Sequence, residues 1–573
     1  MDNKQISHIF EEIADMLDIS GEEFFRVNAY RKAAFGISNL PFSLKTIVQN
    51  SPHELDKMPG IGEHLKKKII ELVNTGKCEE HEQLKKKIPA GILEMLHLRG
   101  IGPKKIQLFY HRLKITNIGG LKKAAEEHKI REIEGMGEKS EQEILKSIEE
   151  YSTFQPKRIL ISYADSEAEK IIDYMKECKA VKKIQYAGSL RRGHETIGDI
   201  DILVAAKSSD SKIIMDHFVK YSEAIKTIVE GETKSTVLLN IGVDVDLRIV
   251  DEDIFGAALH YFTGNKDHNI KIRELAKKKG LKVSEYGVFK DEKLLCGKTE
   301  EEVFASVGLP YIIPELRRDE GEIEFGLSHK FPKFIELSDI KGDLHCHSTY
   351  SDGQNSLEKV AEAYIKMGYE YFAITDHSSV MGVTGGMGKK EIEKQWKEID
   401  NLNKKLKGKI KIFRGCEVDI LKDGSLDFGD EILKQLEVVI ISAHLYHNLP
   451  YEDQTKRLIA AIENPYSKIL GHPTGRLINK RAPMEFDMEK IISACAQNNV
   501  AIEINSNPQR LDLIDKYIKI AKDKKVKITI STDSHNFPQM EYMKYGVLTA
   551  RRGWLEKKDI LNTKPLKEFD SVF

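Results

Sequence analysis

Seven short β-rich runs alternate with helical stretches in the last part of the chain, and this alternation restricts the fold more than any other feature. Strands that alternate with helices usually belong to βαβ units, whose consecutive strands run parallel. Seven such units in a row favour a barrel of parallel strands, a C-terminal α/β domain of the (β/α)7 type over residues 338–573. The runs cover residues 340–347, 371–377, 410–417, 438–444, 469–472, 500–505 and 526–535.

Histidines and acidic residues gather at the ends of these runs. Six runs end in His, Asp or Glu, and the other ends in Asn505. In a parallel barrel the carboxyl ends of the strands meet on one face, which holds the active site. A lone surface histidine would indicate little, but a set at successive strand ends predicts a multinuclear site for Zn²⁺, Mn²⁺ or Fe²⁺. The candidate ligands are His345, His347, Asp352, His377, Glu417, His444, His472, Asp533 and His535.

A second candidate site lies upstream, where a Gly-Ser turn and a basic segment precede the tripeptide Asp199-Ile200-Asp201. On a strand, Asp199 and Asp201 would point to the same face. Such a carboxylate pair can bridge two Mg²⁺ ions, which bind the attacking and leaving oxygens of a phosphoryl transfer. Ser189 stands where a helix would begin, and its hydroxyl and the backbone N–H groups there suit a phosphate. Arg191 or Arg192 would add a charged fork, so the stretch predicts nucleotidyl transfer.

A third acidic residue follows on another expected strand. Residues 243–250 alternate as a strand does, which puts Asp244, Asp246 and Arg248 on one face. Taken singly, a Gly-Ser pair indicates a turn and an Asp-x-Asp a solvated strand end. In this combination and order, the pieces favour a catalytic metal site formed by Asp199, Asp201 and Asp246.

The first 150 residues read as helical, and a short glycine pattern recurs within them. Two glycines flanking an apolar residue make a tight hairpin between helices and let backbone N–H groups approach a phosphate. One copy would favour an ordinary helix C-cap, whereas a repeated unit favours DNA binding. The pattern resembles the helix-hairpin-helix motif, which holds the DNA backbone without reading sequence. The glycine pairs are Gly60 and Gly62, Gly100 and Gly102, and Gly135 and Gly137.

Composition narrows the class of protein further. The 573 residues suggest roughly three to five domains. Because 89 Lys and Arg face 90 Asp and Glu, DNA would be bound through local patches or backbone N–H groups. The six scattered cysteines include no Cys-x-x-Cys pair, which argues against a disulfide framework or a cysteine zinc site. No apolar run approaches the ~20 residues that span a bilayer, and the first residues show no signal-peptide pattern. We expect a cytoplasmic monomer without membrane contact.

Residues 28–34, with the sequence Asn-Ala-Tyr-Arg-Lys-Ala-Ala, precede the first hairpin and closely resemble the lyase domain of DNA polymerase beta. The resemblance places Lys68 at the position of the lysine that forms a Schiff base with a 5′-deoxyribose phosphate. However, Lys68 belongs to a run of three lysines, and such runs are usually solvated. His64 stands where the animal enzyme has a second, phosphate-binding lysine. We expect the Gly60–Gly62 hairpin, with His64 and Lys68 nearby, to bind a 5′-phosphate, and lyase activity through Lys68 is a separate question that the lysine run leaves open.

Residues 259–273, which include Tyr-Phe-Thr-Gly-Asn, and residues 284–289 resemble the nucleotide-selecting segment of family X DNA polymerases. The resemblance covers residues 1–316 and implies an α+β nucleotidyltransferase core of the polymerase beta type, with Mg²⁺ as cofactor and dNTPs as substrates. It implies Asp199, Asp201 and Asp246 as metal ligands. It also implies Ser189, Arg192 and Gly198 at the triphosphate, Tyr261, Phe262, Gly264 and Asn269 at the sugar and base, and Arg273 near the template.

Two positions depart from polymerase beta. Ile197 replaces a hydroxyl-bearing residue, so one phosphate contact would be missing. Asp244 stands where that enzyme has an arginine paired with its third aspartate. Because that arginine is linked there to closure of the active site, the closing step is expected to differ in this chain.

Three motifs of the expected barrel resemble the PHP domain (polymerase and histidinol phosphatase). They are Asp343-Leu344-His345-Cys346-His347-Ser348, Thr375-Asp376-His377 and Thr532-Asp533-Ser534-His535. This family hydrolyses phosphate esters, and all nine ligand positions are occupied here. The resemblance implies a Mn²⁺ or Zn²⁺ cluster, 3′-to-5′ exonuclease or 3′-end-processing activity, and cleavage at abasic sites. We expect Asp376 to support one of the histidines from behind.

The whole chain resembles a bacterial or archaeal family X DNA polymerase with a C-terminal PHP domain. We expect template-directed filling of short gaps in DNA repair, on gapped or nicked, preferably 5′-phosphorylated DNA. Two other functions fit the sequence less well: a free phosphatase does not explain the three aspartates, and a non-catalytic scaffold does not explain twelve candidate metal ligands. An untemplated nucleotidyl transferase remains an alternative, because it would use the same three aspartates. The expected regions are 1–90 (lyase-like), 91–154 (second helix-hairpin-helix), 155–250 (palm), 251–316 (thumb-like), 317–337 (linker) and 338–573 (PHP).

Overall fold

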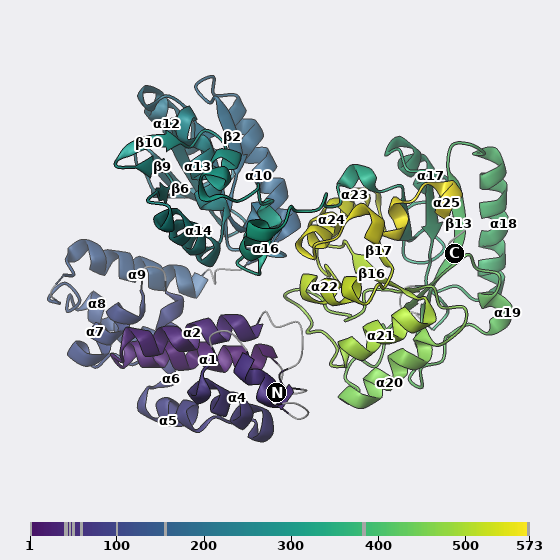
Figure 1. Ribbon diagram of the computed structural model, residues 1–573, viewed down its shortest axis with the longest axis horizontal. Helices are drawn as coiled ribbons and strands as arrows, with labels where there is room; N and C mark the ends of the chain where they lie inside the picture. The colour runs from purple at the N-terminus through teal and green to yellow at the C-terminus, as the bar shows by residue number, and fades with distance from the viewer. Residues whose placement is uncertain are drawn as a thin grey trace. The chain divides into compact units, whose positions relative to one another are not determined.

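Two units make up the chain in the computed structural model, residues 1–157 and residues 158–573 (Figure 1). The structure describes residues 3–38, 44, 47–48, 52–57, 61–98, 101–133, 135–153, 158–380 and 385–569. None of the helices in these ranges is long and apolar enough to cross a membrane. All six cysteines are free thiols.

The first unit is all helical in its described part. In α4, for example, Leu65, Ile69 and Leu72 follow one another at helical spacing and are buried, and they join one core with Phe10 and Phe109. The α-helices are α1 (Asn3–Ile19), α2 (Phe24–Ser38), α4 (Glu63–Thr75), α5 (Glu79–Lys87), α6 (Ala90–Glu94), α7 (Pro103–Leu113), α8 (Ile118–Glu126) and α9 (Glu138–Thr153). Two short 3₁₀ helices, η1 (Pro52–Lys57) and η2 (Met95–His97), lie between them.

The second unit begins with the predicted palm, a five-stranded mixed sheet in the order β2-β4-β7-β6-β5. Strand β7 alternates half-buried and buried side chains, as a strand with one covered face does. The strands are β2 (Lys183–Tyr186), β4 (Asp199–Ala205), β5 (Ala224–Val229), β6 (Lys234–Leu239) and β7 (Asp244–Val250). A small ladder joins β1 (Ile159–Leu160) to β3 (Thr196–Ile197). The helices here are α10 (Ile161–Lys176), α11 (Gly188–Arg191), η3 (Ser208–Asp210) and α12 (Ser211–Phe218).

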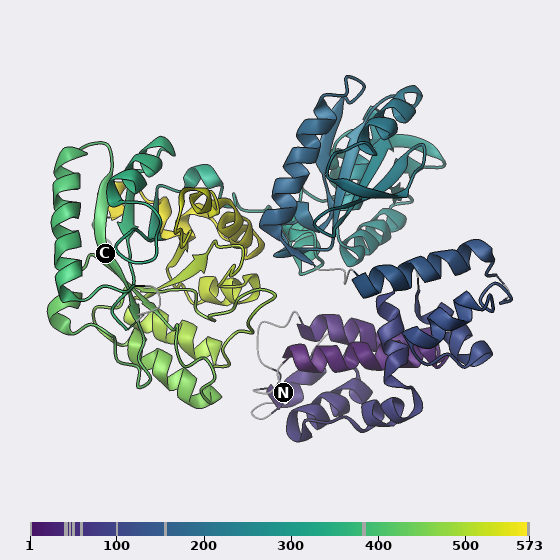
Figure 2. The ribbon, with the colours of Figure 1, turned by 180° about the vertical axis from the view of Figure 1, so that it is seen from behind.

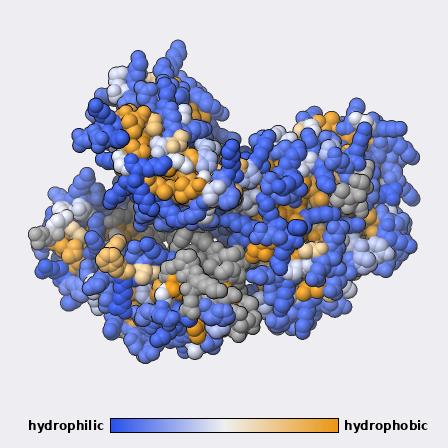
Figure 3. Space-filling view, viewed as in Figure 1, coloured by the Kyte–Doolittle hydropathy of each residue, from blue (hydrophilic) through white to orange (hydrophobic). Residues whose placement is uncertain are grey.

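The thumb follows the palm and has its own core around Phe304. Its helices are η4 (Glu252–Ile254), α13 (Phe255–Thr263), α14 (Lys266–Lys278) and α15 (Glu300–Val307). Strands β8 (Lys282–Ser284), β9 (Gly287–Lys290) and β10 (Lys293–Cys296) form an antiparallel sheet. The face of the molecule in Figure 3 is mainly hydrophilic, with some hydrophobic patches. In the thumb sheet, Leu294 and Leu295 are 48% and 55% exposed.

The prediction of a polar linker over residues 317–337 is wrong in one respect, because the segment is folded. It follows η5 (Pro314–Leu316) and contains α16 (Glu322–Ser328). Its charged side chains are buried by pairing: Arg317 is fully buried against Glu300, and Glu322 accepts a hydrogen bond from His268 Nδ1 at 2.7 Å. Composition alone predicts that such charged residues are solvated, because their ion-pair partners lie far away in the sequence.

The prediction of a parallel barrel is confirmed. Strands β11 to β17 follow one another in sheet order, and every neighbouring pair is parallel. A bridge between Cys346 and Ser534 joins the first and last strands at their ends. The strands are β11 (Gly342–Cys346), β12 (Tyr371–Ile374), β13 (Lys411–Asp419), β14 (Val438–Ser442), β15 (Ile469–Leu470), β16 (Ala501–Asn505) and β17 (Ile528–Ser531).

Helices cover the outside of this barrel, as Figures 1 and 2 show from opposite sides. Most of the strands are buried along their whole length, as expected of parallel strands covered by helices. The α-helices are α17 (Leu357–Lys366), α18 (Lys389–Lys405), α19 (Asp430–Leu433), α20 (Tyr451–Ile462), α21 (Met488–Asn498), α22 (Asp515–Asp523), α23 (Phe537–Met540), α24 (Met543–Arg552) and α25 (Leu566–Phe569). The 3₁₀ helices are η6 (Leu337–Asp339), η8 (Lys557–Asp559) and η9 (Leu561–Thr563).

Palm and barrel share part of one hydrophobic core. The palm residues Ile200 and Val245 belong to the same buried cluster as Leu511 and Tyr545 of the barrel. The two regions therefore pack directly on each other within the second unit.

Candidate active sites

The three palm aspartates come together at the ends of two adjacent strands. Strands β4 and β7 are parallel, and Asp201 lies opposite Asp246 in their register. Burial and the Asp199 and Asp246 carboxylates raise the pKa of Asp201 to about 7. Gly188 leaves room for this cluster: its φ is 61°, and a Cβ there would lie 2.1 Å from Oδ2 of Asp201. Carboxylates packed so closely repel one another unless cations balance them, which fits oxygen-binding Mg²⁺.

A lysine of the neighbouring strand β6 reaches the third aspartate. Lys234 Nζ lies 2.8 Å from Oδ2 of Asp246, and Thr236 donates its hydroxyl to Oδ1 at 2.6 Å. Sequence comparison with polymerase beta points only to Asp244, where the arginine partner is missing. The structure supplies a cationic partner from a different strand, which only the register of β6 against β7 could reveal.

The turn before β4 holds the predicted triphosphate contacts. Ser189 lies in the first turn of α11, and Gly198 directly precedes β4. Arg191 is committed to a buried ion pair with Glu300, whereas Arg192 Nη1 donates to the Thr263 carbonyl at 2.7 Å. Burial and the Arg318 guanidinium lower the pKa of Arg192 to about 10, so it is still a cation at neutral pH.

The predicted nucleotide-selecting residues lie together at the junction of α13 and α14. Asn269 donates Nδ2 to the carbonyls of Tyr261 and Gly264 at 2.7 and 3.2 Å. A Cβ at Gly264 would lie 2.5 Å from Oδ1 of Asn269, so a larger residue there would displace the Asn269 side chain. Phe262 packs edge-to-face on Tyr261, and Arg273 Nε donates to the Asn269 carbonyl at 3.3 Å.

The nine candidate ligands of the barrel converge at the carboxyl ends of its strands. Glu417 of β13 lies at the centre: one of its oxygens, Oε1, is 2.8 Å from His472 Nε2 and 3.2 Å from His444 Nε2. The other, Oε2, is 3.0 Å from His377 Nδ1 and 3.3 Å from His345 Nε2. Three overlapping groups have the spacing of metal ligands: His347, Asp352, His377 and His535; His345, His347 and Asp533; and His377, Glu417 and His444.

Several ligand atoms are buried without hydrogen-bond partners among the described residues. They are Nε2 of His345, both ring nitrogens of His347, Nδ1 of His377 and Oε2 of Glu417. A buried polar atom without a partner costs free energy, and metal ions would satisfy all of these atoms at once. Burial and the neighbouring His535 and His377 lower the pKa of His347 to about 3, which keeps its ring neutral for metal binding. The mixed imidazole and carboxylate set suits Mn²⁺ or Zn²⁺.

Sequence reasoning missed the residues that support these ligands. Glu503 lies 2.8 Å from His345 Nδ1 and accepts from the His472 amide at 2.7 Å. Asp419 accepts from His444 Nδ1 at 3.1 Å. Arg510 Nε lies 3.3 Å from Oδ2 of Asp533. Glu503 lies on β16 two residues from Asn505, and Asp419 lies on β13 two residues from Glu417. This two-residue spacing from a predicted strand-end residue was the one feature of the sequence that could have identified them.

Asp376 does not support a histidine ring as predicted. It accepts hydrogen bonds from Ser348, Ser351 and Gln395, which tie the loop after β11 to the end of β12. The reason is orientation: residues Asp376 and His377 are adjacent in sequence, so their side chains point in different directions.

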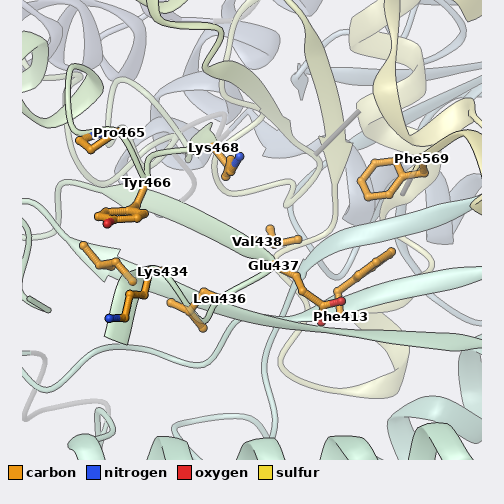
Figure 4. A pocket seen from close by; sticks show the side chains of 10 residues that line it. Phe413, Lys434, Leu436, Glu437, Val438, Pro465, Tyr466, Lys468 and Phe569 are labelled. Carbon is orange, nitrogen blue, oxygen red and sulfur yellow. The ribbon is translucent and has the colours of Figure 1, made fainter. Parts of the chain in front are cut away.

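Two cavities lie at opposite ends of the barrel. One, of about 980 Å³, borders the candidate ligand His444. Its lining is mixed, with polar residues such as Lys422 and Arg481 and apolar ones such as Leu449. The other, of about 270 Å³, lies at the starting ends of the strands near Val438 and Lys468 (Figure 4). It contains none of the candidate ligands.

The hairpin glycines of the first unit stand at the starts of helices. Gly62 and Gly102 are the residues before α4 and α7, and Gly137 precedes α9. A Cβ at any of these positions would meet nothing within 4 Å, so a ligand can approach the backbone closely. Gly135 has φ of 83°, in the region that glycine favours. Gly60 and Gly100 lie outside the described residues.

The predicted lyase lysine is held in an ion pair. Lys68 Nζ lies 3.1 Å from Oε2 of Glu80, which also accepts from the Tyr30 hydroxyl at 2.7 Å. Although partial burial favours the neutral acid, the hydrogen bonds from Tyr30 and Lys68 lower the pKa of Glu80. His64 Nε2 is 3.9 Å from the same oxygen and is exposed. Lys68 and His64 thus lie on one side of α4 beside an acidic residue that sequence reasoning did not consider.

Comparisons with known proteins match successive regions of the chain to separate family models. Family models match for a helix-hairpin-helix domain (residues 1–78), a SAM-like helix-hairpin-helix tandem (92–150), the DNA polymerase beta palm (163–240), the DNA polymerase beta thumb (258–318) and a PHP domain (343–507). The DNA polymerase/3′-5′ exonuclease PolX of Bacillus subtilis (strain 168) is 38% identical over 575 residues, which cover 100% of this chain and 99% of that protein.

The barrel alone also has relatives. A probable phosphatase of Caldicellulosiruptor bescii is 30% identical over 206 residues, which are 34% of this chain and 80% of that protein. A probable phosphatase of Thermoanaerobacter sp. (strain X514) is 32% identical over 205 residues, which are 34% of this chain and 78% of that protein.

Proposed function

Because the chain belongs to the family X DNA polymerases that carry a C-terminal PHP domain, we propose that it fills short gaps in DNA during repair. It is a DNA polymerase with a PHP-domain exonuclease. The observation that carries it is the cluster of Asp199, Asp201 and Asp246 beside the turn that contains Ser189. Mg²⁺ ions, when bound there, would stabilise the attacking and leaving oxygens of nucleotidyl transfer.

The other residues of this site receive roles from their positions. Arg192 is a cation beside the aspartates and would bind the triphosphate of an incoming dNTP. Tyr261 and Phe262 would pack against its sugar and base, with Asn269 fixing the backbone between them. We place Arg273 near the template.

The test is primer extension on a gapped, 5′-phosphorylated duplex with Mg²⁺ and dNTPs. Asp201→Ala should lose extension by orders of magnitude and keep the 3′ nuclease. Asp173→Ala, at an exposed position of α10, is the matched control and should extend normally. Undiminished extension by Asp201→Ala would refute the site, and equal extension of a single strand would favour an untemplated transferase.

The second part of the proposal is that the barrel removes 3′-terminal nucleotides with bound Mn²⁺ or Zn²⁺. Support comes from the nine converging ligands and from the groove beside His444. Metal ions held by these histidines and carboxylates would bind phosphate oxygens and supply hydroxide near neutral pH. We extend the proposal to cleavage at abasic sites, because the groove presents the same metal centre to either substrate.

A 3′-end-labelled duplex with Mn²⁺, and the same duplex with one abasic site, tests both reactions. His345→Ala combined with His347→Ala should abolish degradation and leave nucleotide binding by the palm unchanged. His329→Ala, at an exposed position directly after α16, is the control. Degradation of 3′ ends at the wild-type rate by the double variant would end the nuclease assignment.

For the first unit we propose binding of a 5′-phosphate at the hairpin glycines, with Lys68 as the nucleophile of a lyase reaction. Open space around Gly62 and the nearby His64 support phosphate binding. Because Lys68 is paired with Glu80, the reaction requires that pair to open. Borohydride trapping on a 5′-deoxyribose phosphate should fail for Lys68→Ala and succeed for the neighbouring, exposed Lys67→Ala. Equal trapping by both would exclude Lys68, and affinity that is independent of the 5′-phosphate would exclude the binding role.

A further inference from the structure

A turn of the palm lies against the barrel within the second unit. The Gly193 carbonyl, between α11 and β3, accepts a hydrogen bond from Nη1 of Arg552 in α24. A Cβ at Gly193 would lie 3.0 Å from Cβ of Leu548, so the two surfaces are closely packed. Two residues further on, Oε2 of Glu195 pairs with Nη2 of Arg476. The side chains are 29% and 9% exposed respectively, so the pair is largely shielded from water.

Arg476 also holds a backbone segment of the barrel. Its Nε donates to the Arg510 carbonyl at 2.7 Å, and its Nη2 donates to the Leu511 carbonyl at 2.6 Å. Leu511 has φ of 41°, in the left-handed region that leucine rarely adopts. A strained conformation of this kind persists only where surrounding contacts fix it, and Arg476 supplies two of these contacts.

The same segment brings a side chain to the metal centre. Arg510 Nε lies 3.3 Å from Oδ2 of Asp533, while Oδ1 of this carboxylate lies 3.3 Å from His347 Nε2. Nη1 of Arg510 is buried and has no hydrogen-bond partner within the described ranges. Arg510 thus holds a candidate metal ligand from behind, and such partners orient ligands and tune metal affinity.

We propose that Glu195, a residue of the palm, is a positioning residue for the nuclease reaction of the barrel. Glu195 orients Arg476, Arg476 fixes the backbone at Arg510 and Leu511, and Arg510 then keeps Asp533 in the orientation that metal binding requires. The inference rests on the proposed nuclease function. It gives a polymerase residue a part in the other active site, which a purely structural interface would not have.

The charges around Glu195 make its carboxylate hard to replace. Although burial favours the neutral acid, Arg476 and Arg552 lower the pKa of Glu195, so it is an anion at neutral pH. Removing this charge leaves the Arg476 guanidinium without its carboxylate partner, whereas Arg552 keeps Asp515. Breaking a buried pair in this way is costly because the remaining charge stays uncompensated, and movement of Arg476 relieves that cost.

The test compares Glu195→Gln, Glu195→Asp and the wild type as full-length proteins. Mn²⁺ binding to the barrel is measured by calorimetry, and 3′-end degradation and primer extension are measured on the same preparations. Glu195→Gln should weaken Mn²⁺ binding and slow degradation about 10-fold, the lower end for a residue that supports a metal ligand. Primer extension should be unchanged, and Glu195→Asp should recover most of the loss because it retains the charge.

A matched control separates this path from the interface in general. Asp165 of α10 contacts Tyr545 and Lys544 of the barrel at 3.0 and 2.6 Å, and neither contact is made to Arg476 or Arg510. Asp165→Asn should therefore bind Mn²⁺ and degrade 3′ ends as the wild type does. In an Arg476→Met background, Glu195→Gln should cause no further loss, because the two residues act in series.

Three outcomes would overturn the inference: wild-type Mn²⁺ binding by Glu195→Gln, additive losses in the double variant, or an equal loss in Asp165→Asn. If Glu195→Gln does not fold, Arg510→Gln tests whether Arg510 positions Asp533. Wild-type Mn²⁺ affinity in Arg510→Gln would also overturn the inference. A wild-type protein that binds Mn²⁺ but leaves 3′ ends intact would refute the nuclease proposal, whereas Mn²⁺ calorimetry on Glu195→Gln would still decide whether Glu195 positions Asp533.

Discussion

Replacing Gly188 by alanine should remove primer extension and leave the nuclease intact. Gly188 adopts φ of 61°, and an added Cβ would lie 2.1 Å from Oδ2 and 3.1 Å from Cγ of Asp201. Non-bonded heavy atoms pack best at roughly 3.5 Å, so the turn or the aspartate must move by about 1 Å or more. Because we propose that Asp201 shares a metal site with Asp199 and Asp246, any such movement would displace a metal ligand.

The size of the effect follows from two separate terms. Alanine in the left-handed region costs ~1–2 kcal/mol of folding free energy, which lowers stability without affecting catalysis directly. A misplacement of about 1 Å at a reacting centre costs on the order of 100-fold in rate, or ~2.7 kcal/mol of activation free energy. We therefore expect Gly188→Ala to extend primers at least ~100-fold more slowly and to unfold only slightly earlier than the wild type.

Single-turnover extension of a gapped duplex measures the rate, and thermal unfolding measures the stability. Gly280→Ala is the matched control, since Gly280 has φ of 69° and a Cβ there would meet nothing within 4 Å. It carries the same backbone cost without the clash. Wild-type extension by Gly188→Ala would refute the reasoning, and so would an equal loss in Gly280→Ala, because backbone strain alone would then explain both.

Three more results are expected from contacts described above. Lys234→Met should strengthen Mg²⁺ binding at the palm about threefold, because the lysine no longer competes with Mg²⁺ for the Asp246 carboxylate. The partly exposed ion pair is worth roughly 0.5–1 kcal/mol. Weaker Mg²⁺ binding by calorimetry would contradict this. Chelation with EDTA should lower the unfolding temperature of the barrel and Mn²⁺ should restore it by mass action, and an unchanged temperature would deny the metals a part in stability. Asn562→Ala should lower the free energy of unfolding of the second unit by roughly 1–3 kcal/mol in urea titrations, because the buried carbonyls of Gly342 and Ile530 lose their hydrogen-bond donor. Asn401→Ala, at an exposed position, is the control. An equal loss of stability in Asn401→Ala would show that these two hydrogen bonds are not the cause.

The parts of the fold that sequence alone predicts are those with local signals. Each barrel strand is a short run with its ligand at the end, so both the repeat and the converging site can be read along the chain. The spacing of Asp199 and Asp201 likewise needs only the two-residue period of a strand. A parallel arrangement then brings the strand ends together whatever the details of packing.

The parts that were missed depend on partners far away in the sequence. Arg510 matters because Asp533 lies beside it, and Glu503 because β11 and β15 bring His345 and His472 to it. Residues 317–337 look like a linker because Arg317 is charged, and its buried partner Glu300 cannot be read from composition. The contact between Lys234 and Asp246 requires the register of two strands, which a sequence pattern does not contain.

The shared core changes what a polymerase fragment can be. A chain cut after residue 337 would lose Leu511 and Tyr545 from the cluster that packs on Ile200 and Val245 of the palm. Hydrophobic residues of the palm core would then face water. The barrel is therefore part of the framework that holds the palm site, and the contacts between palm and barrel stabilise both active sites.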